Sequence, residues 1–145
     1  MKKNVCITFF MLFVLNVYSQ DIDFIIRLGI KPTIITEDAR NNNYTFNNMI
    51  EKSSNLPAIQ ITFPKRIEWY VLKNGICVKQ EITTSNDYEA GILLLNMYYF
   101  LRAFSFTHVF YGLWTGNFNG EFVTVSYLRE EDGIHRFTYQ YSLKY

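Results

Sequence analysis

The chain contains few of the residues that stabilise or activate the commonest small proteins. Its 145 residues include two cysteines, two histidines and three prolines. Cys6 lies in an apolar N-terminal segment, so Cys77 is the one cysteine in the rest of the chain. A lone cysteine excludes a disulfide framework within that part of the protein. We therefore expect Cys77 to behave as a small, buried apolar residue.

Motifs that indicate catalysis or metal binding are also missing. The sequence has no Cys-x-x-Cys, His-Glu-x-x-His or Gly-x-Ser-x-Gly pattern and no phosphate-binding glycine loop. The acidic run at residues 130–132 lacks the spacing of a calcium loop. His135 stands beside Arg136 in a strand pattern, so we expect it to be a surface histidine. These absences predict no metal and no cofactor, and they favour a protein without enzymatic activity.

The chain has almost no net charge. Fourteen basic and 13 acidic residues give a formal net charge of +1. Without Lys2 and Lys3, the 12 remaining basic residues face 13 acidic ones, and the net charge becomes −1. A nearly neutral surface gives no long-range attraction to a phosphate backbone. We therefore expect no nucleic-acid partner.

The N-terminal segment has the pattern of a secretory signal peptide. Lys2 and Lys3 precede an apolar run over residues 5–17, and Ser19 supplies a small residue before Gln20. As a helix the run is about 20 Å long, short of the roughly 30 Å of a bilayer core.

The Ser19–Gln20 junction resembles the cleavage site of exported bacterial proteins. We therefore expect residues 1–19 to be removed and the protein to be periplasmic or extracellular. Residues 20–145 have the length of a single globular domain. No stable membrane span is expected after cleavage; the alternative is that the segment is retained as an anchor.

The apolar patterns predict an α+β fold with a mainly antiparallel sheet of about six or seven strands. Strand patterns occur at residues 21–28, 33–35 and 58–63, and a short helix is predicted at 44–52. Residues 112–143 read as three strands joined by tight turns, a meander. The sequence shows no internal repeat.

Residues 66–83 predict a β-hairpin around Asn74-Gly75, a dipeptide typical of two-residue turns. Uninterrupted pairing from this turn places Glu68 opposite Glu81, both on the wetter face. The opposite face would then collect the large apolar side chains of the hairpin, which are Ile67, Trp69, Val71, Val78 and Ile82.

A long helix is predicted over residues 87–104. Asn86 can cap it, and Glu89 stands at the third position of a capping box. The segment contains so few polar residues that we expect the helix to be buried on nearly all sides, packed on the sheet. One alternative makes the segment strands of an all-β barrel. Another makes residues 90–114 a membrane span, which Arg102 disfavours.

Aromatic residues make up 18% of the chain, and tyrosines gather in its C-terminal half. Tyrosine combines an apolar ring with a polar tip and is common at interfaces. Candidate binding residues are Tyr139, Tyr141 and Arg136 of the last strand, which we expect to be an exposed sheet edge, and Trp114. Trp114 lies between Gly112 and Gly116, which we expect to allow close approach of neighbouring backbone or rings.

Three functions fit these features. The first is a small exported envelope protein with a non-catalytic binding role, such as an inhibitor or an immunity-type protein, and a protein partner. The second is a small-ligand or glycan-binding module that uses the C-terminal tyrosines. The third is a small hydrolase with a dispersed site that contains His108 or His135. The sequence leaves the oligomeric state open.

Overall fold

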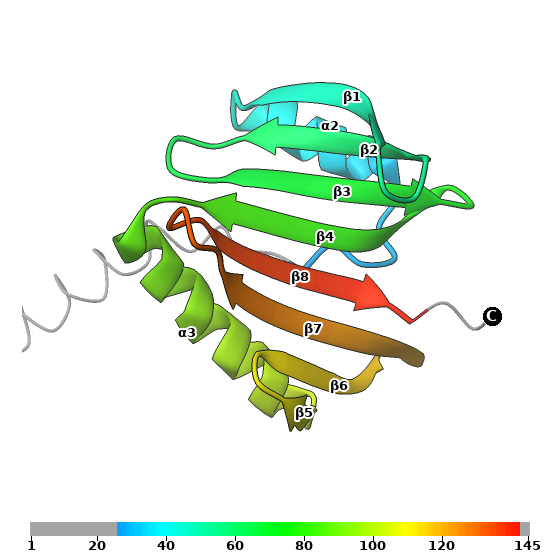
Figure 1. Cartoon of the computed structure of the whole chain (residues 1–145). Helices are drawn as coiled ribbons and strands as arrows, with labels where there is room; N and C mark the ends of the chain where they lie inside the picture. Colours follow the sequence, from blue (N-terminus) through cyan, green and yellow to red (C-terminus); the bar gives the residue numbers. More distant parts are fainter. Residues whose placement is uncertain (1–25, 143–145) are drawn as a thin grey trace, which may run out of the picture.

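One antiparallel sheet of eight strands dominates the computed structural model, which describes residues 26–142 (Figure 1). The predicted signal peptide lies outside the described residues. The elements, in chain order, are α2 (Pro32–Asn41), β1 (Thr45–Glu51), β2 (Leu56–Thr62), β3 (Ile67–Lys73), β4 (Ile76–Thr84), α3 (Asp87–Ala103), β5 (Thr107–Phe110), β6 (Leu113–Phe118), β7 (Glu121–Arg129) and β8 (His135–Tyr141).

The spatial order of the strands is β1-β2-β3-β4-β8-β7-β6-β5. The α+β class and the antiparallel sheet are therefore confirmed, while the predicted count of six or seven strands is too low. The sheet is open, with β1 and β5 at its edges, so the barrel alternative is wrong.

The two halves of the fold repeat one topology, a helix followed by a four-stranded meander. The meanders join through β4 and β8, which pair at the centre of the sheet. Both helices end in the same way: Asn43 and Ser105 have positive φ, and the next amide donates back into the helix over 2.8 Å in each case. The repeat is thus one of backbone geometry, and the sequence does not show it.

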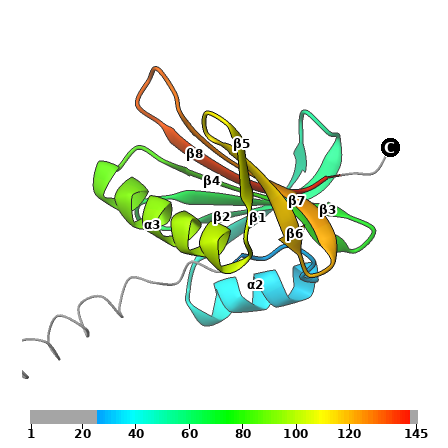
Figure 2. The ribbon, with the colours of Figure 1, turned by 90° about the horizontal axis from the view of Figure 1, so that it is seen from below.

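Both helices lie on the same side of the sheet (Figure 2). The register places one row of side chains on this covered face across six neighbouring strands: Ile59, Tyr70, Gln80, Tyr139, Val125 and Trp114. Apolar members of the row pack against Ile35 of α2 and against Leu93, Met97 and Phe100 of α3. The core is therefore the layer between the helices and one sheet face.

The 66–83 hairpin is confirmed, but its register is not the predicted one. The Asn74-Gly75 turn pairs Lys73 with Ile76 as expected, and then a β-bulge at Val78 shifts the remaining pairs by one residue. Next to the bulge, the Cys77 carbonyl accepts a hydrogen bond from the amide of residue 29, and the Cys77 amide donates to the carbonyl of residue 30. As a result of the bulge, Glu68 faces Ile82 on the covered face, and Trp69 faces Glu81 on the open face.

Three N-terminal predictions are wrong within the described residues. Residues 26–28 form no strand, although Leu28 is buried. Residues 33–35 belong to α2, which starts at Pro32, a residue well suited to a first helical position. Residues 44–52 hold β1 rather than a helix, because seven pairs with β2 outweigh a weak helical periodicity. The predicted strand at 58–63 corresponds to β2.

The long helix is confirmed as α3, and the side chain of Asn86 accepts a hydrogen bond from the Glu89 amide. Its expected burial on all sides is wrong, because Tyr88, Leu95, Tyr98 and Tyr99 are exposed. No helix within residues 26–142 is long and apolar enough to cross a membrane. The segment 90–114 is instead divided among α3, β5 and β6.

The predicted meander at 112–143 is confirmed as β6, β7 and β8, and β5 precedes it as an additional edge strand. The expectation that the last strand is a sheet edge is wrong, since β8 pairs with β4 on one side and β7 on the other. Both glycines around Trp114 allow close approach, as expected. A Cβ on Gly112 would lie 2.4 Å from a backbone oxygen of Tyr127, and one on Gly116 would lie 2.6 Å from the Phe106 ring.

Candidate functional site

The structure does not gather the four predicted binding residues into one site. Tyr139 is fully buried in the core, and Tyr141 is half-buried beside it on the covered face. Arg136 points to the opposite, open face, where it pairs with Glu81 and with Glu130. Trp114 is half-buried at the far end of the covered face. Trp114 lines a groove of about 560 Å³, and Tyr141 lines a separate pocket of about 310 Å³.

Large apolar side chains are exposed along α3 and along the adjoining edge strand. Leu95, Tyr98 and Tyr99 lie three or four residues apart and so share one stripe of the helix. The chain leaves the helix at Phe104 and reaches β5, where more large apolar residues are exposed. We call this the α3–β5 surface, made of Leu95, Tyr98, Tyr99, Phe104, Val109, Phe110 and Tyr111.

A groove of about 560 Å³ adjoins the α3–β5 surface between the helix and strands β5 and β6. Its wall is mainly apolar, and Arg102, His108 and the Tyr98 hydroxyl are among its polar groups. The His108 and Trp114 rings lie 5.4 Å apart on neighbouring strands. The groove therefore suits an apolar side chain whose neighbour carries a negative charge.

His135 is buried, so its predicted surface position is wrong. Its Nε2 lies 2.9 Å from Asp87 Oδ1, and its Nδ1 lies 2.9 Å from the Tyr127 hydroxyl. The pKa of Asp87 is lowered by the hydrogen bond with His135 and then by the charge of Arg129. Because both ring nitrogens are engaged, this geometry makes His135 an anchor between β8 and the start of α3 rather than a base.

Cys77 is buried, as predicted, and desolvation raises the pKa of its thiol to about 12. A thiol with such a pKa is almost wholly protonated at neutral pH and is a weak nucleophile. Within residues 26–142, no group of three or more His, Cys, Asp or Glu side chains is placed to hold a metal ion.

A buried ionic network occupies the other half of the covered face. The Nε of Arg66 donates to Glu68 over 2.6 Å, and its Nη1 donates to Glu89 of α3 over 2.6 Å. Glu68 also accepts from the Tyr70 hydroxyl and, over 3.2 Å, from the Gln80 amide. Burial alone would lower the pKa of Arg66, but the charges and hydrogen bonds of the two glutamates outweigh it and raise that pKa.

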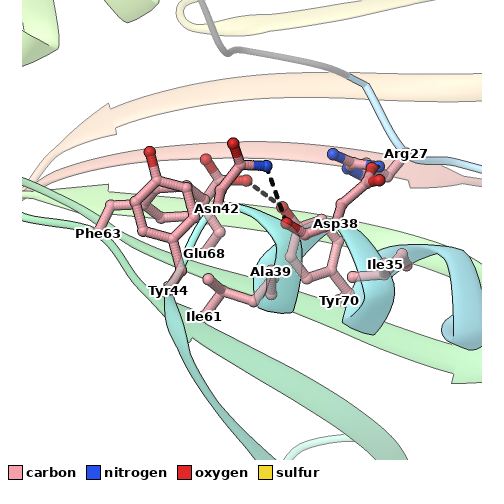
Figure 3. Close-up of a pocket in the computed structure, with 10 residues that line it drawn as sticks. All are labelled: Arg27, Ile35, Asp38, Ala39, Asn42, Tyr44, Ile61, Phe63, Glu68 and Tyr70. Atoms are coloured by element: carbon pink, nitrogen blue, oxygen red, sulfur yellow. Dashed lines mark hydrogen bonds and ion pairs between the residues drawn. The ribbon is translucent and has the colours of Figure 1, made fainter.

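Glu68 forms part of the wall of a cavity of about 240 Å³ between α2 and strands β2 and β3 (Figure 3). An Arg27–Asp38 ion pair lies on the same wall. The cavity is lined by Arg27, Ile35, Asp38, Ala39, Asn42, Tyr44, Ile61, Phe63, Glu68 and Tyr70. The cavity lies beside the helix of the first half of the fold, and the α3 groove lies beside the helix of the second.

Sequence reasoning missed both sites for identifiable reasons. The bulge at Val78 brings Gln80 and Ile82 of β4 onto the face of Glu68 and Tyr70, which is the face that the helices cover, and no residue type in the hairpin signals it. The stripe of Leu95, Tyr98 and Tyr99 is visible in the sequence at helical spacing. Apolar character alone does not separate a core face from an exposed one, so the sequence predicts that this stripe is part of the core.

No protein-family model matches the chain, and neither a curated protein nor a solved structure matches it.

Proposed function

We propose that this protein is exported and acts as a non-catalytic binding protein of the inhibitor or immunity type, and that it docks a protein partner on the α3–β5 surface. The observation that carries the proposal is the exposure of the large apolar side chains in this surface, up to 93% for Tyr111. Contiguous exposed apolar patches are typical of interaction sites, and aromatic side chains dominate interface energetics.

The groove indicates which side chains of the partner it would accommodate. Its apolar wall accommodates one large aliphatic or aromatic anchor, and burial of such an anchor stabilises a complex. Arg102 and His108 favour a carboxylate next to that anchor, and no acidic residue lines the groove. The expected epitope is therefore a protruding loop that combines a large apolar side chain with Asp or Glu.

The export part of the proposal rests on the N-terminal sequence pattern. Mass spectrometry of the protein from its native envelope gives a direct test. A mature chain that starts at Gln20, or at its pyroglutamate form, supports export, and an intact Met1 contradicts it.

A paired-variant binding experiment tests the docking surface. We expect the double variant Tyr98→Ala/Phe110→Ala to bind the partner at least about 30-fold more weakly, because truncating a hot-spot residue costs about 2 kcal/mol or more. The matched control is Met49→Ala/Ile50→Ala on the opposite sheet edge, where Ile50 is 56% exposed against 62% for Phe110. The partner is captured from envelope extract with the wild-type protein, identified, and measured by calorimetry.

Two outcomes contradict the proposal. One is that no stoichiometric partner is captured. The other is that the captured partner binds the Tyr98→Ala/Phe110→Ala variant as tightly as the control. If light scattering shows that the chain itself dimerises through the α3–β5 surface, the partner is a second copy and the inhibitor role is wrong.

A further inference from the structure

We propose that the cavity under α2 binds a small organic ammonium cation, at a site separate from the docking surface and independent of it. The cavity volume of about 240 Å³ is several times the roughly 30 Å³ that a water molecule occupies in the liquid. It therefore has room for a small organic molecule. Figure 3 shows that its wall combines aromatic rings with carboxylates.

The aromatic part of the wall is suited to a cation. The Tyr44 and Phe63 rings both lie on the cavity wall, 4.5 Å apart at an angle of 51°. Arg66 already lies over the Phe63 ring, 4.3 Å from its centre, and Arg66 is not part of the cavity wall. Aromatic faces attract cations through the ring quadrupole, and paired rings are a recurrent site for quaternary ammonium groups.

Among the described residues, the ion pairs on and beside the cavity wall sum to one net negative charge. The Arg27–Asp38 pair is neutral as a unit. Arg66 pairs with Glu68 of the cavity wall and with Glu89 behind it, so this triad carries a net charge of −1. Glu68 is only 2% exposed, and a buried uncompensated charge is unfavourable. A monovalent cation in the cavity beside Glu68 supplies the missing charge.

The hydrogen bonds of Glu68 are consistent with a cation beside it in the cavity. Burial, and then the charge of Glu68, raise the pKa of Tyr70 well above its ordinary value, so the Tyr70 hydroxyl keeps its proton and donates to Glu68. Glu68, which lines the cavity, also accepts hydrogen bonds from Arg66 and Gln80. Asp38 is more exposed and lies on the same wall, so a second carboxylate attracts cations toward the cavity.

Titration of the purified protein with matched probes tests the proposal. We expect choline or n-butylammonium to bind saturably, with a dissociation constant below about 10 mM. The uncharged carbon isostere of choline, 3,3-dimethylbutan-1-ol, is expected to bind at least about tenfold more weakly, because it lacks the cation that the rings and Glu68 attract. Calorimetry and NMR titration give both constants.

Variants locate the binding. Tyr44→Leu keeps an apolar side chain but removes a π face, and it is expected to weaken choline binding about fivefold. Phe46→Leu is the control, since Phe46 lies two residues further along the chain, in β1, outside the cavity wall, and contacts Arg40 instead. Glu68→Gln is expected to weaken binding at least about tenfold. Because the Glu68→Gln change affects a buried network, circular dichroism first verifies that this variant is folded. If Glu68→Gln does not fold, the Tyr44→Leu variant decides the test.

Three results would overturn the proposal. The first is the absence of saturation by either cation. The second is equal binding of the uncharged alcohol, which would make the cavity a simple apolar site. The third is unchanged choline binding in Tyr44→Leu, which would place the cation elsewhere on the protein.

Discussion

Replacing Arg66 with alanine is expected to lower the free energy of unfolding by about 3–5 kcal/mol, the cost typical of removing one partner from a buried ion pair. The change leaves Glu68 and Glu89 facing each other's negative charge without the guanidinium that lies 2.6 Å from each. It also removes the cation from the Phe63 ring. The magnitude is large because both carboxylates are shielded from water.

Urea denaturation measures this effect, and Arg40→Ala is its control. Arg40 also lies over an aromatic ring, that of Phe46, but it is exposed and has no buried carboxylate to neutralise. We expect Arg40→Ala to change stability by less than about 0.5 kcal/mol. Equal effects of the two arginine variants would show that the network is not buried in solution.

Replacing Phe100 with alanine is expected to destabilise the protein by about 3–5 kcal/mol, as truncation of a buried Phe usually does. Phe100 joins α3 to the sheet, with its ring centre 5.2 Å from Phe118 of β6 and 5.7 Å from Tyr139 of β8. It also packs on Phe104 and Phe106 at the end of the helix. Its loss leaves a cavity at the centre of this aromatic cluster.

The adjacent Tyr99 provides a control of the same chemical class on the same helix. Phe100 is 9% exposed and Tyr99 is 60% exposed, so Tyr99→Ala should cost less than about 0.5 kcal/mol. Thermal and urea unfolding of both variants measures the difference. Similar losses for the two variants would mean that α3 is buried on both sides, contrary to the structure.

These two pairs of variants separate folding from binding. Phe100 and Arg66 hold the covered face together, while the exposed Tyr99 of the α3–β5 surface is expected to contribute little to stability. A variant of that surface that folds normally and loses its partner therefore reports binding rather than misfolding.

Local signals in the sequence were sufficient for the elements with strong turn or cap chemistry. Asn74-Gly75 indicates the position of the β3–β4 hairpin, and Asn86 indicates the start of the long helix α3. These residues act through their own backbone preferences, which do not depend on distant contacts. The meander ending in β8 followed from the same kind of reasoning.

The remaining features depend on contacts between distant segments. Residues 45–51 form an edge strand because β2 is there to pair with them, and their own helical spacing is overridden. The central place of β8 comes from the repeat of topology, which no sequence similarity reveals. The cavity requires α2 to lie over Glu68, so neither segment alone indicates it.

The repeat relates the two candidate sites. Each half places a helix over its own strands and leaves a space between them, and the residues there determine its chemistry. In the first half the space is small and contains buried charge. In the second half it is larger, apolar and continuous with an exposed face. The same backbone arrangement can thus accommodate a small cation in one half and a protein partner in the other.

Hydrogen exchange of the protein, with and without its captured partner, tests the docking surface most directly. We expect the partner to slow the exchange of amides in residues 95–111 at least about tenfold, because an interface excludes water from them. Strand β1, at the other edge of the sheet, should exchange at an unchanged rate. Protection confined to β1 and α2, with none in residues 95–111, would contradict the proposal that the α3–β5 surface is the binding site.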